Sequence, residues 1–311
     1  MSQPDVIVIL GPTATGKSDV AFMLARRLGG RVIGADSIQV YRGLDAGSCK
    51  PSAAARREIP HDLIDVADPR EPFSAGRFAR MATKSIDAAR RAGQVPIEAG
   101  GTGLYLRALL KGIAPMPPRD EALRSELYAR AREESPERLH QELEAVDPGS
   151  AARIGRRDLQ RIVRALEVIR LTGIGLSRHL SDHAAAAGGV PALKVGLEMD
   201  RALLYRRVDE RVDGIFAAGI VQEVRELLAA GVPAESNALK ALGYREVMGH
   251  LRGETDLETT VDLVKRNTRR YARRQFAWFR RESGVRWFDV GAVSTERIAQ
   301  TVAGLHAGRG A

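Results

Sequence analysis

Eight consecutive residues near the start of the chain have the types and spacing of a phosphate-binding loop. The segment GPTATGKS matches the P-loop pattern G-x-x-x-x-G-K-[ST]. Its glycines let backbone N–H groups turn toward phosphate oxygens, and a following helix start adds partial positive charge. The lysine supplies a full charge to the terminal phosphate, and the serine hydroxyl can bind Mg²⁺. The predicted diphosphate- or nucleotide-binding residues are Gly11, Pro12, Thr13, Ala14, Thr15, Gly16, Lys17 and Ser18.

A carboxylate follows the second predicted strand, Arg31–Ala35. Asp36 would therefore lie at the carboxyl edge of a parallel sheet, where ligands bind in α/β proteins. An Asp-Ser pair after a strand is also a common turn or helix cap, so a purely structural reading stays open. The strand Val95–Ala99 lacks the terminal aspartate with which kinases and nucleotide hydrolases usually hold Mg²⁺, and its nearest acid, Glu98, lies inside the strand. The bound phosphates therefore need not belong to ATP.

These residues require an α/β framework. Val6–Leu10 is a short apolar run, typical of a strand buried on both faces of a parallel sheet. Ser18–Leu28 carries apolar residues at helical spacing, Phe73–Arg91 predicts another helix, and Val95–Ala99 another strand. Strands that alternate with helices indicate βαβ units. We therefore expect an α/β fold with a P-loop NTPase-like parallel sheet as its core.

A helical insertion interrupts this alternation. The prolines of Pro115–Pro118 break the pattern, and the chain from Arg119 to about Leu180 is predicted to be helical, with Ser135 as a helix N-cap. The alanine- and glycine-rich segment 184–189 indicates a second joint, and Leu193–Glu198 alternates like a strand that returns to the sheet. We predict a catalytic core of residues 1–115 and 190–311, and a helical insertion domain of residues 116–189.

Positive charge is concentrated in the predicted helical C-terminal region. The chain has 48 Lys and Arg against 39 Asp and Glu, a net charge of +9. The segment Lys265–Arg286 contains nine basic residues and one acid, so it carries +8 and leaves +1 for all other residues. Such a cluster suits a polyanion such as nucleic acid, although a solvated helix face would have the same composition.

Composition narrows the class of protein. Hydrophobic residues make up 44% of the chain and charged residues 28%, which excludes disordered, collagen-like and disulfide-scaffold proteins. No apolar run approaches 18 residues, and the start of the chain has no signal-peptide pattern. The single cysteine fits a reducing compartment. We expect a cytoplasmic protein without a membrane span.

Seven segments occur in an order that resembles the bacterial tRNA dimethylallyltransferases, also called tRNA isopentenyltransferases, of the IPP transferase family. They are GPTATGKS, DSIQVYRG, KPS, GGTGLYLRALLKG, RDLQRIVRALEVIRLTG, ALGYREV and KRNTRRYARRQFAWFRR. The P-loop alone is unspecific, but a P-loop followed by DSxQVY and GGTGLY is highly specific. The resemblance covers the chain from Val6 to about Phe288, and it departs from the family pattern at Glu98, where an aliphatic residue is usual, and at His61-Asp62, where two histidines are common.

The resemblance implies a reaction and its substrates. Dimethylallyl diphosphate would donate its five-carbon group to N6 of adenosine 37, beside the anticodon of tRNA. Lys17, Thr13, the loop amides and Mg²⁺ at Ser18 would stabilise the leaving diphosphate. Asp36 would be the general base for the N6 amine. The adenosine would leave its stack to reach Asp36, and the protein is expected to act as a monomer.

The resemblance also implies contacts to the anticodon stem-loop of tRNA. The first group follows the sheet strands and comprises Asp36, Ser37, Ile38, Gln39 and Thr102. The second group lies in the insertion and comprises Arg124, Gln160, Arg161, Ile162, Val163 and Arg164. The third group forms a turn of Lys240, Ala241, Leu242, Gly243, Tyr244 and Arg245. The fourth lies on the basic helix and comprises Asn267, Thr268, Arg269, Arg270, Tyr271, Ala272, Arg273 and Arg274.

Three other functions are compatible with parts of the sequence. An adenylate isopentenyltransferase would use free AMP or ATP as acceptor, but it has little use for the insertion or the basic helix. A small-molecule P-loop kinase would need the missing strand-tip aspartate. A nucleotide-gated RNA-binding protein without catalytic activity would leave Asp36 and Thr102 without a chemical task.

Overall fold

The computed structural model describes residues 6–186 and 190–308, and the chain divides into two compact units. Unit 1 comprises Met1–Leu110 and Val190–Ala311, and unit 2 comprises Lys111–Gly189. Unit 2 thus begins at the end of α4 (Gly103–Lys111), slightly before the proline-rich segment that suggested the boundary. The joint predicted at 184–189 is wrong for residues 184–186, because α9 (Leu176–Ala186) continues through them. Residues 187–189 lie outside the described part of the chain.

A parallel sheet forms the centre of unit 1. Its strands are β1 (Val6–Leu10), β2 (Arg31–Gly34), β3 (His61–Asp62), β4 (Pro96–Ala99), β5 (Ala192–Glu198) and β6 (Val285–Asp289). Within the described residues the sheet has six strands in the order β3-β2-β4-β1-β5-β6, and every neighbouring pair is parallel. All five residues of β1 are buried, as expected for a central strand covered on both faces. The predicted fold class is confirmed.

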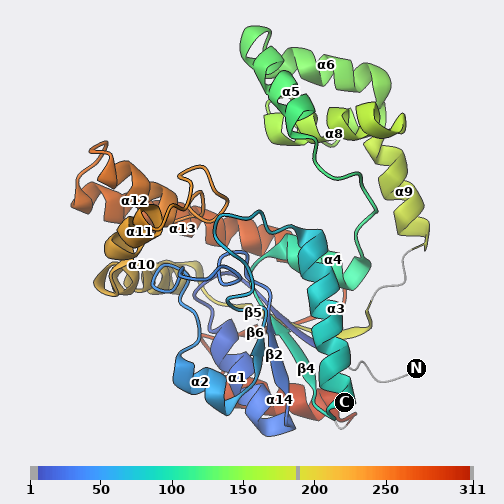
Figure 1. Ribbon diagram of the computed structural model, residues 1–311. Helices are drawn as coiled ribbons and strands as arrows, with labels where there is room; N and C mark the ends of the chain where they lie inside the picture. Colours follow the sequence, from blue (N-terminus) through green and yellow to red (C-terminus); the bar gives the residue numbers. More distant parts are fainter. Residues whose placement is uncertain (1–5, 187–189, 309–311) are drawn as a thin grey trace. The chain divides into compact units, whose positions relative to one another are not determined.

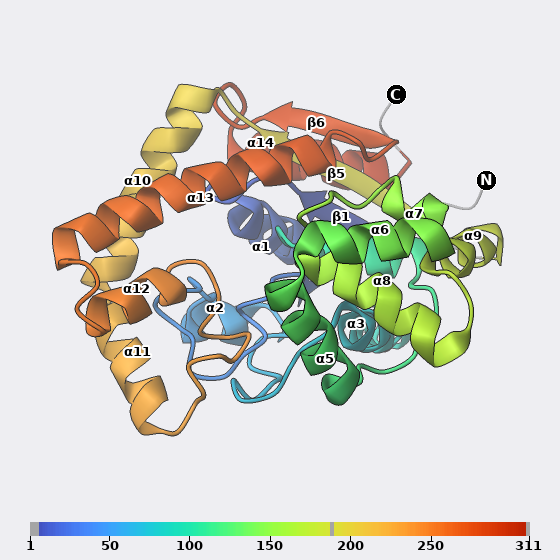
Figure 2. The same cartoon turned by 90° about the horizontal axis from the view of Figure 1, so that it is seen from above.

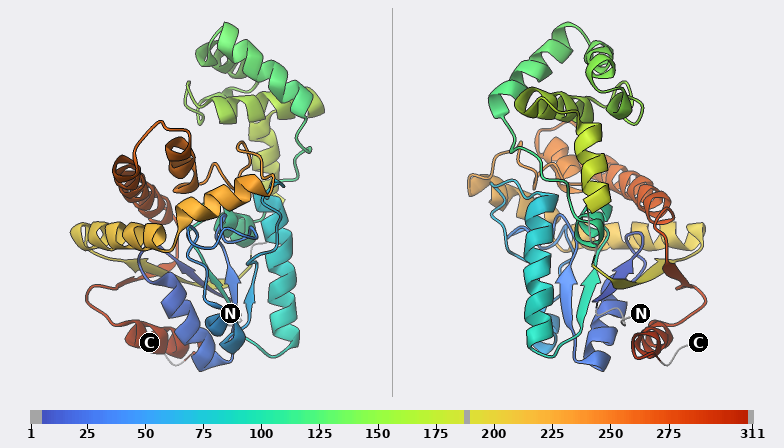
Figure 3. Two further views of the ribbon diagram at one scale, coloured as in Figure 1. Left: turned by 60° about the vertical axis from the view of Figure 1, so that its left-hand side comes forward. Right: turned by 90° about the vertical axis from the view of Figure 1, so that its right-hand side faces the viewer.

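Helices cover both faces of the sheet (Figures 1 and 3). On one face, α1 (Lys17–Leu28) and α14 (Thr295–His306) pack against the odd-numbered β1 residues Ile7 and Ile9. On the other face, α3 (Ala75–Arg91) and α4 pack against the even-numbered residues of β1. Gly29 caps α1 in the left-handed conformation (φ 61°), as the Gly-Gly pair predicts.

The remaining helices of unit 1 all precede β6 in the chain. They are α2 (Ala53–Glu58), α10 (Arg201–Ala217), α11 (Ile220–Ala229), α12 (Tyr244–Leu251) and α13 (Leu257–Phe279). The long α13 packs against α10 and α12 (Figure 2). The apolar face of α13 belongs to the core, because Ala272 and Phe279 are fully buried and Phe276 contacts Trp287.

All the regular secondary structure described in unit 2 is helical. Its helices are α5 (Glu121–Glu133), α6 (Pro136–Val146), α7 (Pro148–Ala151), α8 (Leu159–Thr172) and α9. Leu127, Leu139, Leu143 and Ile162 are fully buried in a core that belongs to this unit alone. The predicted cap at Ser135 is confirmed, because its side chain accepts a hydrogen bond from the N–H of Arg138. Among the described helices, none has the length and hydropathy of a membrane span.

Candidate functional site

Three loops converge at the carboxyl edge of the sheet. The P-loop (residues 11–18) follows β1, a second loop (residues 36–50) follows β2, and a third (residues 100–103) follows β4. Because β2, β4 and β1 are neighbours in the sheet, their carboxyl ends lie side by side. The N–H of Ser37 donates to Oγ1 of Thr102 over 3.0 Å, and the N–H of Thr102 donates to the carbonyl of Ala35 over 3.2 Å. The fold thus brings Asp36 and Thr102 together beside the P-loop.

The P-loop is held in shape by contacts among its own residues. Oγ1 of Thr15 and Nζ of Lys17 both donate to the carbonyl of Pro12, over 2.8 and 2.6 Å. Gly11 has φ 148°, and a Cβ there would lie 2.5 Å from the carbonyl oxygen of Leu197, so only glycine fits. The loop enters α1 through Gly16, which is left-handed (φ 79°). The strand–loop–helix arrangement predicted from the motif is confirmed.

Lys17 lies in an unusual electrostatic setting. Desolvation lowers the pKa of Lys17 to about 7, repulsion by Arg211 adds to this effect, and the charge of Asp36 opposes it. A polyanion bound by the loop would favour the charged form of this lysine. Arg211 comes from α10 and was not among the predicted site residues. No local motif marks it, because it reaches the P-loop only through the folding of a distant helix.

The carboxylate of Asp36 caps a turn and still has an oxygen that the turn does not use. Its Oδ1 accepts hydrogen bonds from the N–H groups of Ile38 and Gln39, over 2.8 and 3.3 Å, which is the turn expected after a strand. These bonds use one carboxylate oxygen, and the side chain is only half-buried. The turn fixes the orientation of the carboxylate without requiring its second oxygen.

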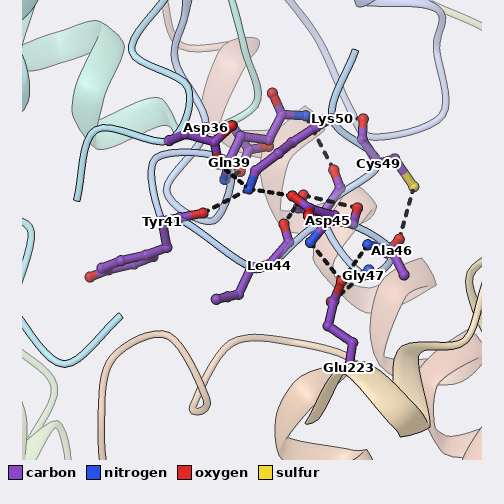
Figure 4. A network of polar contacts seen from close by, with 12 residues as sticks. Asp36, Gln39, Tyr41, Leu44, Asp45, Ala46, Gly47, Cys49, Lys50 and Glu223 are labelled. Atoms are coloured by element: carbon purple, nitrogen blue, oxygen red, sulfur yellow. Dashed lines mark hydrogen bonds and ion pairs between the residues drawn. The ribbon is translucent and has the colours of Figure 1, made fainter. Parts of the chain in front are cut away.

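A network of polar contacts orders the 36–50 loop (Figure 4). Nε2 of Gln39 donates to the carbonyls of Ser48 and Cys49 across the loop, over 3.1 and 3.3 Å. Nζ of Lys50 donates to the carbonyl of Tyr41 over 2.7 Å and to carboxylates of Asp45 and Asp65 over 2.7 and 2.6 Å. The predicted contact residue Gln39 therefore also serves as an internal brace.

Glu223 on α11 holds the tip of the same loop (Figure 4). Its Oε2 accepts from the backbone N–H groups of Asp45 and Ala46, both over 2.7 Å, and its Oε1 accepts from the hydroxyl of Tyr244 over 2.7 Å. A Cβ at position 47 would lie 2.6 Å from the ring of Tyr244, so this position also requires glycine. Glu223 is a second residue that sequence motifs did not identify.

The predicted contacts on α12 and α13 differ in their exposure. Lys240 and Arg245 are exposed, whereas the side chain of Tyr244 is fully buried. Along α13, Arg270, Arg273 and Arg274 are exposed, whereas Thr268 and Ala272 are buried. Arg269 donates to both carboxylate oxygens of Asp209 over 2.6 and 2.7 Å, and Asn267 donates to Oε1 of Glu246 over 2.9 Å. The exposed arginines are the members of this group that are placed to meet a ligand.

The predicted contacts in unit 2 divide in the same way. Gln160 and Arg161 are exposed, whereas Ile162 and Val163 are fully buried in the core of the unit. Arg124 is 8% exposed and forms an ion pair with Glu167 over 3.3 Å. Arg164 binds the same carboxylate over 2.6 Å. In this conformation Arg124 and Arg164 neutralise a buried acid.

The donor set at the P-loop fits a Mg²⁺ ion carried largely by phosphate. No group of three or more His, Cys, Asp or Glu side chains in the described ranges is arranged to hold a metal. The side chain of Ser18 is exposed at the first turn of α1. Mg²⁺ commonly takes only one or two ligands from a protein and completes its octahedral shell with phosphate oxygens and water. A hydroxyl at this place suits such a site.

Asp62 and Glu98, the two departures from the family pattern, differ in their surroundings. Asp62 accepts two hydrogen bonds from Nη1 of Arg31, over 3.0 and 3.1 Å, so it ties the edge strand β3 to β2. Glu98 is fully buried between Val8 of β1 and Ile33 of β2. Neither of its carboxylate oxygens has a hydrogen-bond partner among the described residues, and burial raises the pKa of Glu98 to about 8.

The sequence and the fold are similar to those of known proteins. The family described as IPP transferase matches residues 39–282, and the family described as isopentenyl transferase matches residues 4–65. The tRNA dimethylallyltransferase of Geobacter metallireducens is 46% identical over 301 residues, which cover 97% of each chain.

Solved structures agree with this similarity. The full-length tRNA isopentenylpyrophosphate transferase of Bacillus halodurans has a TM-score of 0.72 and 37% identity, and the match covers 99% of this chain and 97% of that one. A eukaryotic dimethylallyltransferase, described as acting on tRNA, has a TM-score of 0.80 and 25% identity. That match covers 98% of this chain and 80% of the eukaryotic one.

Proposed function

The chain belongs to the IPP transferase family, and we propose that it transfers a dimethylallyl group from dimethylallyl diphosphate to N6 of adenosine 37 in tRNA. The observation that carries this proposal is the convergence of the P-loop, Asp36 and Thr102 at one sheet edge. Asp36 is close enough for its charge to influence the pKa of Lys17. One loop can thus hold a diphosphate while its neighbour receives an acceptor.

The proposed reaction makes one bond and breaks one. The bond between C1 of the dimethylallyl group and the diphosphate oxygen breaks, and the diphosphate leaves with the electron pair. N6 of adenosine forms the new bond to C1 and gives its proton to the carboxylate of Asp36. Lys17, Arg211 and the loop amides stabilise the negative charge that develops on the diphosphate. Mg²⁺, held by Ser18 and the phosphates, would supply further neutralisation of that charge.

The acceptor would be held by surfaces outside the P-loop. The exposed Arg270, Arg273 and Arg274 on α13 offer positive charge to the phosphates of an anticodon stem. Gln160 and Arg161 of unit 2 offer exposed polar groups on a separate folded element. We expect the protein to act on tRNA as a monomer.

The product identifies the function directly. Purified protein would be incubated with unmodified tRNA and Mg²⁺, together with either dimethylallyl diphosphate or ATP, and the digested nucleosides analysed by mass spectrometry. We expect N6-dimethylallyladenosine only with dimethylallyl diphosphate. Phosphoryl transfer from ATP, without prenylation, would instead indicate a kinase and contradict the proposal.

A further inference from the structure

A side chain on α13 joins two of the loops at the site. Gln275 is 6% exposed, and its amide binds a different loop at each end. Oε1 accepts from the backbone N–H of Thr13 in the P-loop over 2.9 Å. Nε2 donates to the carbonyl of Gly101 in the 100–103 loop over 2.8 Å. Gln275 belongs to the last of the seven family segments, but it lies just beyond the residues predicted to contact tRNA and had no predicted role.

Close packing and hydrogen bonding together fix the orientation of the Gln275 side-chain amide. A Cβ at position 101 would lie 2.4 Å from Nε2 of Gln275, and a Cβ at position 103 would lie 2.6 Å from the ring of Trp278. The 100–103 loop therefore approaches α13 as closely as glycine allows. A flipped amide would place its NH₂ group against the N–H of Thr13 and its oxygen against the carbonyl of Gly101, so hydrogen bonding also fixes its orientation.

Tyr271 lies one helical turn before Gln275, on the same side of α13. The side chains of Gln275 and Thr102 are close enough to its hydroxyl to influence its pKa. Burial raises the pKa of Tyr271 to about 12, and the nearby charge of Asp36 contributes. Thr102 in turn accepts from the N–H of Ser37. The residue after Asp36 is thus bonded to the 100–103 loop, and Gln275 bonds the same loop to Thr13 of the P-loop.

The bond to Thr13 has a consequence for the P-loop. The N–H of Thr13 is directed to Gln275, so the loop presents its later amides, beyond Ala14 (φ 65°), to a phosphate. The position of Thr13 is set by α13 as well as by the loop itself. Displacing a reacting group by about 1 Å can lower a rate by about 100-fold. The amide of Gln275 therefore sits where it can control the alignment of donor and acceptor.

We propose that Gln275 is a positioning residue, which holds Thr13 and the 100–103 loop at a fixed separation so that the leaving diphosphate and the acceptor amine are aligned. The inference rests on the proposed transfer reaction and adds to it a residue that touches neither substrate. Its effect is exerted through Thr13, which we place against the diphosphate.

The first test compares two changes of the same chemical kind. Gln275→Met keeps the length of the side chain and removes both hydrogen bonds, and Gln300→Met makes the same change at an exposed position on α14. We expect Gln275→Met to lower kcat by about 10- to 100-fold while the KM values for tRNA and dimethylallyl diphosphate stay within about threefold. Gln300→Met should leave all three constants unchanged. Thermal melts verify folding, and Gln275→Asn replaces the Met variant if the latter does not fold.

The second test asks whether Gln275 acts through Thr13. In a double-mutant cycle with Thr13→Ala, Gln275→Met should lower kcat further by less than about threefold, because the group that it positions is already absent. A full, multiplicative loss in the Thr13→Ala background, or a normal kcat for the single variant, would overturn the proposal. Failure of the wild-type protein to prenylate tRNA would instead overturn the proposed function, so the two failures are distinguishable.

Discussion

The two carboxylate oxygens of Asp36 leave room for a structural task and for the catalytic task that we propose. Oδ1 caps the turn that follows β2, and the carboxylate remains partly exposed beside the P-loop. A side chain whose orientation is fixed by its own backbone is suited to accept a proton at a defined place. The turn reading of the Asp-Ser pair and its catalytic reading are therefore compatible.

The proposed role of Asp36 as a base can be separated experimentally from its role in the turn. Asn at this position keeps an oxygen that can accept from the N–H of Ile38, but it cannot take the proton from N6. We expect Asp36→Asn to lower kcat by about 10²–10⁴-fold and to change the affinities for tRNA and dimethylallyl diphosphate by only a few-fold. Single-turnover rates and equilibrium binding would be measured for both proteins. Near-normal turnover would remove Asp36 from the chemistry.

Glu98 makes the stability of the fold depend on pH. The pKa of Glu98 is about 8 in the folded protein, raised by burial from 4.5. The folded state therefore binds a proton more tightly than the unfolded state, and stability falls as pH rises from about 4.5 to about 8. A single shift of this size corresponds to a loss of roughly 5 kcal/mol across that window.

Glu98→Gln should remove this dependence, because glutamine has no charge to desolvate. We expect the free energy of unfolding of the variant to exceed that of the wild type at pH 9 and to approach it at pH 4.5. Denaturant melts at both pH values would measure the difference. A wild-type advantage at pH 9 would show that Glu98 is charged and has a favourable partner in the fold.

At the scale of elements, α13 has an inner face that packs against the site loops and an outer face that is exposed. Its inner face carries Gln275 and the buried Ala272, and its outer face carries Arg270, Arg273 and Arg274. Two other basic residues of the helix, Lys265 and Arg269, form ion pairs with Asp213 and Asp209 of α10. The basic cluster seen in the sequence is thus partly structural and partly available to a polyanion.

The exposed arginines of α13 predict how salt affects the binding of tRNA. Replacing the three exposed arginines, Arg270, Arg273 and Arg274, with Gln should weaken tRNA binding and flatten the plot of log K against log salt by about 2–3 units, since each phosphate contact contributes roughly 0.7–0.9. A matched control would replace three exposed arginines elsewhere, Arg27, Arg57 and Arg91, with Gln. Affinities from 50 to 300 mM salt would be measured for all proteins. Equal slopes for both triple variants would mean that α13 is only a solvated face.

Local signals explain which elements could be predicted. The P-loop, the strand before it and the cap at Ser135 depend on neighbouring residues and are confirmed. The prediction omits β3, which is two residues long, and α14, although Ile298 and Val302 have the helical spacing that would have supported it.

The rest of the site depends on contacts between distant residues. Arg211 acts on Lys17 through its charge, and Gln275 binds Thr13 through a hydrogen bond. Both residues lie on helices far along the chain from the P-loop, and no short motif encodes their approach. A family segment also contains both exposed side chains, which can meet a ligand, and buried ones, which cannot. Tyr244, Ile162 and Val163 belong to predicted contact segments, yet their side chains are buried. Burial is decided by the packing of whole helices, which the segment alone does not reveal.

At the scale of the whole molecule, the chain combines a core that carries the P-loop with a separately folded helical unit. A free nucleotide is small enough to be held by loops at the sheet edge alone. The exposed arginines of α13 lie outside these loops, and they suit the phosphates of a longer polyanion. The molecule as a whole therefore favours tRNA over free adenylate.

The choice of acceptor tests this conclusion most directly. Unmodified tRNA and AMP would be offered together with labelled dimethylallyl diphosphate and Mg²⁺, and the label located by mass spectrometry of intact AMP and of mapped tRNA fragments. We expect the label in tRNA, on the adenosine at position 37, with at least about 100-fold less on AMP. Label that accumulates on AMP, or that is spread over many adenosines of the tRNA, would contradict the proposed function.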